Sequence, residues 1–226
     1  MDLLGLLLPQ RCAVCSCPGS ALCAACRDGL KRLRAPMCAS CGAPTAWPVE
    51  RCRECRGRRL AFATARAAVL YDRGARSIVA AWKERGIRVL AEAAAELVCE
   101  AIAAPPVEGL VFVPPDGERL LRRGHNPSCA LALELARRWQ LPVGDALVRK
   151  RRAGRQRGLS RSDRRRNIAG AFRARPVSLP RSLCVVDDVY TTGATVSAAA
   201  SALRAAGARE IHVVTFARTA RVSSER

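Results

Sequence analysis

Beyond about residue 60, short apolar runs alternate with longer stretches in which apolar positions recur at helical spacing. The short runs are typical of buried strands, and the longer stretches are typical of helices with one apolar face. Strands are expected over 61–71, 110–113, 183–186 and 211–216, and helices over 76–84, 89–103, 127–139 and 195–206. Strands that alternate with helices indicate an α/β fold with a mostly parallel sheet.

Capping residues support several of these boundaries. Asn126 is a good helix cap, and Pro127 suits the first position of a helix because an N–H has no partner there. Gly207 closes the last helix, and the prolines at 105–106 end the second one. The helix over 127–139 is therefore expected to begin at its proline.

The first 60 residues follow a different pattern, in which cysteine dominates. Nine of the twelve cysteines lie within the first 55 residues, and eight of the nine form four Cys-x-x-Cys pairs. Two such turns complete a tetrahedral zinc site with four thiolate ligands, so four pairs predict two structural zinc ions. The predicted ligands are Cys12, Cys15, Cys23, Cys26, Cys38, Cys41, Cys52 and Cys55. We therefore divide the chain into a double zinc-ribbon module, residues 1–60, and a larger domain, residues 61–226.

The sequence leaves the pairing of the four turns open. Sequential pairing gives two consecutive ribbons over 12–26 and 38–55, whereas interleaved pairing gives a cross-braced fold. We favour sequential pairing because it closes the shorter loops. Disulfide bonds are a weaker alternative, since nothing in the sequence indicates an oxidising compartment. Cys17 is left as a spare thiol.

Composition places the chain among globular proteins. Of its 226 residues, 50% are hydrophobic and 26% are charged, and this length is sufficient to bury a core. The apolar run over 3–8 is far shorter than the ~20 residues that cross a bilayer. Asp2 stands where a secretory signal begins with basic residues. We predict a cytoplasmic protein that does not insert into membranes.

Positive charge is concentrated in one segment of this basic chain. The formal net charge is +20, and residues 149–166 hold ten basic residues against one acid, Asp163, which gives this segment a charge of +9. Such a segment attracts polyanions, whether nucleic acid, phosphorylated metabolites or pyrophosphate.

The residues with the most chemistry follow the strand expected over 183–186. Asp187 and Asp188 come directly after it, and a hydroxyl-rich turn then opens a helix. Ligands of parallel sheets bind at the carboxyl ends of the strands. Backbone N–H groups at a helix start form a cradle for a phosphate, and two carboxylates accept hydrogen bonds from sugar hydroxyls or hold hydrated Mg²⁺. Together they predict a ribose 5-phosphate site, with a cradle of Thr191, Thr192, Gly193, Ala194 and Thr195.

The acid pair followed by Thr-Thr-Gly-Ala-Thr resembles the phosphoribosyl pyrophosphate (PRPP) motif of type I phosphoribosyltransferases. With two zinc-ribbon signatures in front of it, nearly the whole chain resembles the ComF family, which includes the competence-associated ComF proteins and the gluconate-related GntX proteins. Further stretches that match this family are 71–86, 113–126, 156–167 and 216–219. The chain departs from the family pattern at His125, where an aromatic residue is usual, and at Pro127, where glutamine is usual.

The resemblance implies a type I phosphoribosyltransferase-like parallel sheet for the larger domain, and roles for its residues. Asp187 and Asp188 would bind the ribose 2′- and 3′-hydroxyls and help to place Mg²⁺, and residues 191–195 would hold the 5′-phosphate. The basic segment would be the mobile loop that closes over the site, with Arg165 as a catalytic candidate. Lys83 is a further catalytic candidate for contact with pyrophosphate. Cationic groups and Mg²⁺ there stabilise the charge that builds on the leaving pyrophosphate.

Two main functional hypotheses follow. The first is a PRPP-binding phosphoribosyltransferase that transfers phosphoribose to an unidentified acceptor, in a family linked to competence and DNA uptake. The second is a non-catalytic zinc-ribbon adaptor that binds single-stranded DNA or a protein partner in DNA uptake. The nine aromatic residues show no regular interleaving with basic ones, which counts against DNA binding because stacking needs exposed rings. A third hypothesis is a purely structural interaction module with a vestigial pocket.

Overall fold

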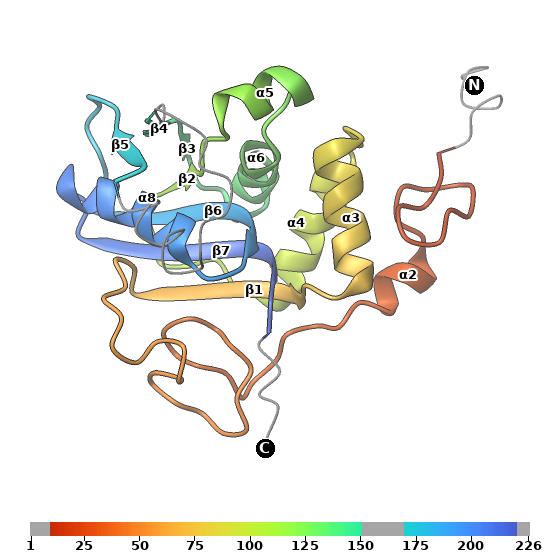
Figure 1. The fold of residues 1–226 in the computed structure, drawn as a ribbon, viewed down its shortest axis with the longest axis horizontal. Helices are drawn as coiled ribbons and strands as arrows, with labels where there is room; N and C mark the ends of the chain where they lie inside the picture. Colours follow the sequence, from red (N-terminus) through yellow and green to blue (C-terminus); the bar gives the residue numbers. More distant parts are fainter. Residues whose placement is uncertain (1–9, 151–169, 221–226) are drawn as a thin grey trace, which may run out of the picture.

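A five-stranded parallel sheet forms the centre of the computed structural model, which describes residues 10–150 and 170–220 (Figure 1). Its strand order is β1-β7-β6-β2-β3, and each neighbouring pair is parallel. The strands are β1 (Thr64–Leu70), β2 (Gly109–Phe112), β3 (Val143–Gly144), β6 (Ser182–Tyr190) and β7 (Glu210–Arg218). The predicted α/β fold with a mostly parallel sheet is confirmed.

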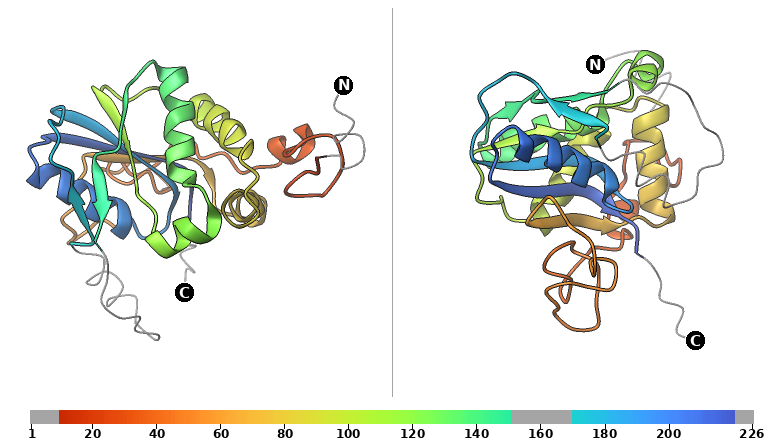
Figure 2. Two further views of the ribbon diagram at one scale, coloured as in Figure 1. Left: turned by 90° about the horizontal axis from the view of Figure 1, so that it is seen from above. Right: turned by 60° about the vertical axis from the view of Figure 1, so that its left-hand side comes forward.

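Helices cover both faces of this sheet (Figures 1 and 2). Among the described residues the helices are α2 (Ala24–Asp28), α3 (Arg73–Glu84), α4 (Leu90–Ala101), α5 (Gly117–Arg123), α6 (Pro127–Trp139) and α8 (Ala194–Ala205). Those that pack against the sheet are α3, α4 and α6 on one face and α8 on the other, whereas α2 belongs to the first cysteine-rich segment. Cys184 and Val186 pack in one core with α3, α4 and α6, whereas Val185 packs in a second core with α8. Burial on both faces explains why this strand is apolar at successive positions. Among the described residues, no helix is both long and apolar enough to cross a membrane.

Helix α6 begins and ends where the sequence predicts. The side chain of Asn126 accepts a hydrogen bond from Ser128 N at 3.0 Å, and Pro127 occupies the first turn. This cap satisfies one of the free N–H groups of the helix start. The cap also fixes Ser128 at the buried start of the helix, which becomes important at the site.

Strand β6 is longer than predicted. It continues through the acid pair to Tyr190, because its backbone stays paired with β7, with Asp187 beside Thr215 and Tyr190 beside Arg218. Strands are paired by hydrogen bonds between backbone groups, so polar side chains do not by themselves end a strand. No strand is predicted between residues 139 and 183, whereas the structure has β3 there and an antiparallel pair, β4 (Leu147–Arg149) with β5 (Phe172–Ala174).

The two cysteine-rich segments lie at separate places on the molecule (Figures 1 and 2). The first ribbon, residues 10–30, lies beside α3 and adds Ala13, Ala21 and Leu30 to the core of the α3, α4 and α6 side. The second ribbon, residues 38–60, lies along the β1 edge of the sheet and adds Cys38 and Cys41 to the core that contains α8. Each ribbon therefore adds residues to a different one of the two cores.

A short linker between the ribbons runs along the edge strand of the sheet. Leu33 N donates to Ala68 O at 2.9 Å, and Leu70 N donates to Lys31 O at 2.8 Å. These bonds pair the linker in antiparallel fashion with the carboxyl-terminal half of β1. The exposed edge of β1 is thereby covered by the chain's own N-terminal part.

Candidate functional site

The eight predicted zinc ligands form two clusters of four. Cys12, Cys15, Cys23 and Cys26 make one cluster, and Cys38, Cys41, Cys52 and Cys55 make the other, with the sulfur atoms of each within 4.8 Å of one another. The pairing is therefore sequential, as favoured from loop length. In the second cluster Sγ of Cys41 and Cys52 are 3.6 Å apart, and Sγ of Cys52 and Cys55 are 3.8 Å apart. A tetrahedral zinc with bonds of about 2.3 Å needs sulfur separations of about 3.8 Å, so the donor set fits this ion.

Backbone N–H groups favour the thiolate form of cysteines in both clusters. Burial opposes ionisation of Cys12, yet hydrogen bonds from backbone N–H groups lower its pKa to about 6. Burial also opposes ionisation of Cys38, and backbone N–H groups lower its pKa to about 7. Zinc binds the thiolate form, so these bonds favour the state that the metal requires.

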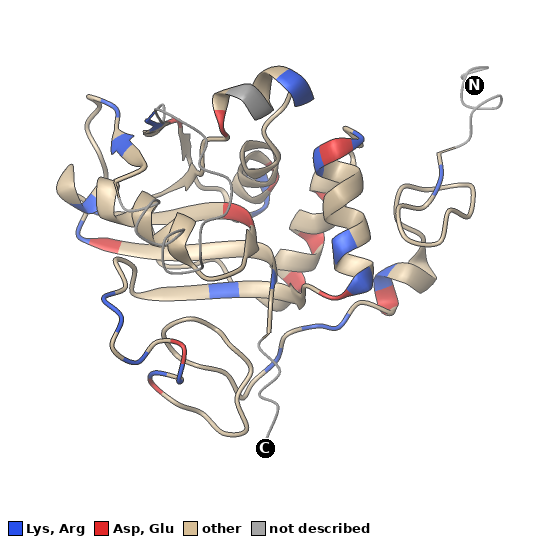
Figure 3. Cartoon of the chain, viewed as in Figure 1, with Lys and Arg blue, Asp and Glu red and all other residues tan. Residues whose placement is uncertain are grey.

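The acid pair lies at the carboxyl end of the central strand β6, as Figure 3 shows by its red segment. Asp187 is 9% exposed and Asp188 is 6% exposed. The hydroxyl of Ser128 donates to Asp187 Oδ1 at 2.8 Å, and Asp188 N donates to the same oxygen at 3.0 Å. Both acids are thus held by the fold beside the start of α6.

The charge state of Asp187 is set by opposing effects. Burial raises the pKa of this carboxyl group, while the charge of Lys83, the hydrogen bond from Ser128 and the charge of Arg149 lower it. A buried carboxyl group whose pKa is shifted by desolvation and by specific nearby cations is typical of a functional site.

Lys83 reaches the acid pair from α3. Its Nζ forms an ion pair with Asp188 Oδ2, and its side chain is 27% exposed. Lys83 is predicted to contact pyrophosphate, and in the structure it lies beside the acid pair. The neighbouring Arg85 is exposed at the end of α3.

The predicted phosphate cradle directly follows β6. Gly193 has a φ of +71° and stands at the start of α8, which has no side-chain cap. Ala194 N lies 3.4 Å from Thr192 Oγ1, and Thr191 is exposed. The turn thus presents backbone and hydroxyl groups at the positive end of the helix dipole, which favours an anion.

Arg149, the first residue of the basic segment, lies close enough to this site for its charge to act on Asp187. Arg149 ends β4, its Nε donates to Pro114 O at 3.3 Å, and its guanidinium lies 4.7 Å from the centre of the Phe172 ring. Arg165 and most of the predicted mobile loop lie outside the described residues. The described strands on either side of residues 151–169, β4 and β5, are paired with each other.

Three residues that contact the site have no predicted role there. Ser128 bonds Asp187, Arg58 bonds the carbonyl of Thr192, and Arg218 packs against Tyr190. Ser128 is marked in the sequence by its position directly after Pro127, at the start of the helix. Arg218 lies in the 216–219 stretch that matches the family, whereas Arg58 is a single arginine in an arginine-rich chain.

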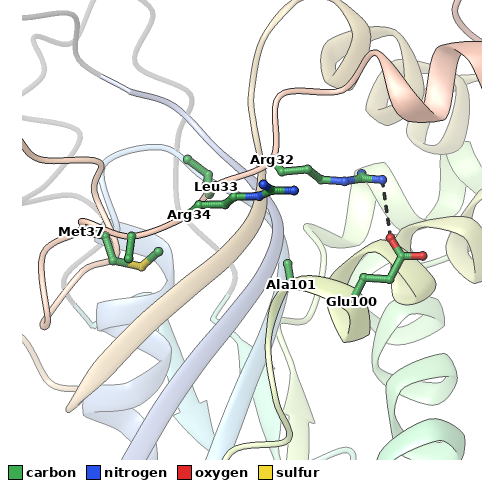
Figure 4. Close-up of a pocket in the computed structure, with 7 residues that line it drawn as sticks. Arg32, Leu33, Arg34, Met37, Glu100 and Ala101 are labelled. Carbon is green, nitrogen blue, oxygen red and sulfur yellow. Dashed lines mark hydrogen bonds and ion pairs between the residues drawn. The ribbon is translucent and has the colours of Figure 1, made fainter.

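A cavity of about 370 Å³ lies elsewhere, between the linker after the first ribbon and the end of α4 (Figure 4). It is lined by Arg32, Leu33, Arg34, Ala35, Met37, Glu100 and Ala101. Its lining includes no residue of the acid pair or of the loop over 191–195, and Arg32 and Glu100 pair across it at 3.5 Å. The chemistry of the site therefore does not involve this cavity.

Family models match the two parts of the chain. The double zinc ribbon domain matches residues 3–56, and the phosphoribosyl transferase domain matches residues 120–225. Fold and site together define a phosphoribosyltransferase-type protein with an N-terminal double zinc ribbon. The DNA utilization protein YhgH of Salmonella typhimurium is 30% identical over 227 residues, which cover 95% of this chain and 99% of that protein. The chain belongs to the ComF family.

Two further relatives carry competence in their names. Competence protein F of Haemophilus influenzae is 38% identical over 116 residues, which cover 49% of this chain and 50% of that protein. Competence protein ComFC of Streptococcus pneumoniae is 24% identical over 201 residues, which cover 88% of each chain. The match with Competence protein F thus spans half of that protein, whereas the other two span most of theirs.

Proposed function

We propose that this protein binds PRPP together with Mg²⁺ and transfers its phosphoribosyl group to an acceptor. The single observation that carries the proposal is the buried acid pair at the carboxyl end of β6, followed directly by a glycine turn that opens α8. Carboxylates next to an anion cradle match a ligand with two sugar hydroxyls and a phosphate at opposite ends.

Each part of the site has a role in this proposal. Asp188, with Asp187 behind it, accepts hydrogen bonds from the ribose hydroxyls, and residues 191–195 hold the 5′-phosphate. Bound Mg²⁺ supplies positive charge that neutralises the pyrophosphate. Lys83, which pairs with Asp188 in the free protein, turns to the pyrophosphate when the ribose takes over the carboxylate. The arginines of 149–166, Arg165 among them, close over the same group.

The reaction is a substitution at the anomeric carbon. The bond from this carbon to the pyrophosphate oxygen breaks, the pyrophosphate leaves with the electron pair, and a bond forms from the nucleophilic atom of the acceptor. Positive charge develops on the sugar and negative charge on the leaving group. Preplaced cations beside the leaving group therefore lower the barrier.

Calorimetric titration of the full chain with PRPP and Mg²⁺ tests this proposal. We expect Asp188→Asn to weaken PRPP binding by at least about tenfold, which is about 1.4 kcal/mol. Asp28→Asn, an exposed residue with the same change of charge, serves as the matched control and should bind as the unchanged protein does. Equal affinity of the Asp188 variant and the control would refute the proposal.

A second candidate function is a non-catalytic adaptor that binds single-stranded DNA or a protein partner. The names of the relatives, which mention DNA utilization and competence, favour it, as does the net charge of +20. Affinity for single strands should then fall steeply with salt and weaken when Arg164, Arg165 and Arg166 are replaced by glutamine. Salt-independent binding would count against it. In both cases we place the protein in the cytoplasm, where zinc thiolates stay reduced.

A further inference from the structure

The loop after β6 rests on the side chain of Tyr190. A Cβ on Gly193 would lie 2.2 Å from Tyr190 Oη, so the ring lies directly against the glycine. The ring is buried and meets the edge of the Phe62 ring, with centroids 6.4 Å apart and planes at 83°. The position of this tyrosine therefore determines the shape of the glycine turn.

Three consecutive carbonyl groups at the loop accept hydrogen bonds from outside it. Thr219 donates its N–H to Tyr190 O at 3.0 Å and its hydroxyl to Thr191 O at 3.1 Å. Arg58 Nη2 donates to Thr192 O at 2.9 Å. Within 10–150 and 170–220, no hydrogen bond engages the N–H groups of Thr191 and Thr192. Fixing the carbonyls in this way leaves the N–H groups for an anion.

Arg218 joins this tyrosine to the second ribbon. Its side chain is 1% exposed, and its guanidinium lies 4.9 Å from the centre of the Tyr190 ring. The same guanidinium donates to the carbonyl of Cys41 and lies 3.7 Å from Glu54 Oε2. Cys41 is a zinc ligand, and Glu54 precedes the ligand Cys55. One buried group therefore contacts both the metal site and the base of the loop.

The first ribbon is attached differently. Arg27 of this ribbon forms ion pairs with Glu96 and Glu100 on α4. The apolar residues of the ribbon join the core that contains α3, α4 and α6. Among the described residues, no hydrogen bond or ion pair joins residues 10–30 to the loop over 190–195. The two zinc sites thus differ in their connection to the candidate phosphate site.

We propose that the second ribbon is a structural part of the phosphate-binding loop, and that Arg58 and Arg218 are positioning residues that link the second zinc site to affinity for the 5′-phosphate. The inference rests on the function proposed above and extends it to the zinc ribbon. Occupancy of the second zinc site keeps the Cys41 carbonyl and the 51–58 turn in place, and these hold Arg218 and Arg58. Loss of that ion weakens phosphate binding, and loss of the first ion does so much less.

The first experiment compares Arg58→Ala with Arg59→Ala in the full chain. Arg59 is exposed and adjacent, so both variants lose the same charge from the same turn. We expect Arg58→Ala to weaken ribose 5-phosphate binding by about tenfold, as loss of one hydrogen bond from a charged donor allows. Arg58→Lys should recover part of the loss, because it keeps one cationic donor. Pyrophosphate, which this loop does not hold, should bind all four proteins equally.

The second experiment removes one zinc ion at a time. Cys52→Ser and Cys23→Ser each replace one half-buried ligand, and each should lower the zinc content from two ions to one. We expect the Cys52 variant to bind ribose 5-phosphate at least about tenfold more weakly than the Cys23 variant. Thermal unfolding of both variants shows whether they are folded, and if the Cys52 variant is not, the Arg58 and Arg59 pair decides.

The possible failures are distinguishable. An unchanged protein that binds neither PRPP nor ribose 5-phosphate refutes the proposed function and this inference with it. Binding that Arg58→Ala weakens no more than Arg59→Ala refutes the inference alone. Equal weakening of ribose 5-phosphate and pyrophosphate indicates a general loss of structure, and it also refutes the inference.

Discussion

The carboxyl group of Asp187 is buried, and its hydrogen-bond and charge partners stabilise its ionised form. Ser128 and the N–H of Asp188 donate to it, and Lys83 and Arg149 supply positive charge nearby. Burial still prevails and keeps its pKa above the ordinary value of 3.8. An acid in this condition is sensitive to the loss of any one partner.

Removal of the Ser128 hydroxyl should change the pH dependence of binding. The hydroxyl stabilises the carboxylate, so Ser128→Ala raises the pKa of Asp187 further. In the proposed function PRPP and Mg²⁺ bind beside the ionised acid, so affinity should be lost as pH falls through this pKa. We expect the acid limb of the affinity profile to move up by about one pH unit, since a hydrogen bond to a charged group contributes about 1.5–3 kcal/mol. Calorimetry between about pH 4 and pH 8 measures it.

The matched control is Ser201→Ala, which removes an exposed hydroxyl that bonds only its own helix, at Ser197 O. Its profile should coincide with that of the unchanged protein.

The free energy of unfolding depends on pH in the opposite direction to the affinity. The folded state holds the Asp187 proton to higher pH than the unfolded state, so the stability that this proton contributes is lost as pH rises through the raised pKa. A Ser128 variant with an unshifted profile would show that the hydroxyl does not tune the acid.

At the scale of residues, the sequence predicted the groups that form a contiguous motif and missed those that come from elsewhere. The acid pair and the loop after it are adjacent in the chain, so their chemistry can be predicted from the sequence. Ser128 lies 59 positions from Asp187, and Arg58 lies 134 positions from Thr192. Only the fold brings such distant residues together. The catalytic roles of Lys83 and Arg165 stay predictions.

Among the elements, the β6–loop–α8 unit depends on one glycine. Gly193→Ala should lower ribose 5-phosphate affinity by more than about tenfold, because the added Cβ meets the Tyr190 ring and the backbone stays at a φ of +71°. Gly144→Ala, where nothing lies within 4 Å of the added carbon, is the control and should bind normally. Calorimetry with ribose 5-phosphate measures both. Normal binding by the Gly193 variant would show that the turn does not hold the phosphate.

Elements with strong local signals were predicted well, and those made by pairing were not. The residues Pro127–Trp139 of α6 form a helix as expected, because its cap and its spacing are local. Strand β6 extends past the acids since β7 continues to pair with it, and the short strands β4 and β5 exist only through each other. Pairing between distant segments leaves little trace in a single sequence.

Across the whole molecule, the two zinc sites are unequally protected. In the second ribbon Cys38, Cys41 and Cys55 are buried, whereas in the first ribbon Cys15 is exposed and Cys23 is half-buried. A chelator reaches an exposed thiolate site more readily, so the ion of the first ribbon should leave before the ion of the second.

The division of the chain into two domains at residue 60 stays a prediction, since the second ribbon shares a core with the sheet.

A colorimetric chelator assay should therefore record two phases of equal amplitude. The Cys23→Ser variant should lack the fast phase, and the Cys52→Ser variant should lack the slow one. Thermal unfolding followed in parallel should show the larger loss of stability with the slow phase, because metal binding contributes to folding free energy. A single phase, or the opposite assignment, would contradict the difference in burial.

The linker that runs beside β1 also bears on how copies of this chain behave toward one another. By pairing with Ala68 and Leu70, it occupies backbone groups that an edge strand otherwise offers to a neighbouring molecule. Detachment of the N-terminal segment would uncover this edge and create a template for strand addition between copies. Because the linker between the ribbons is paired with β1, we expect it to protect the sheet against self-association.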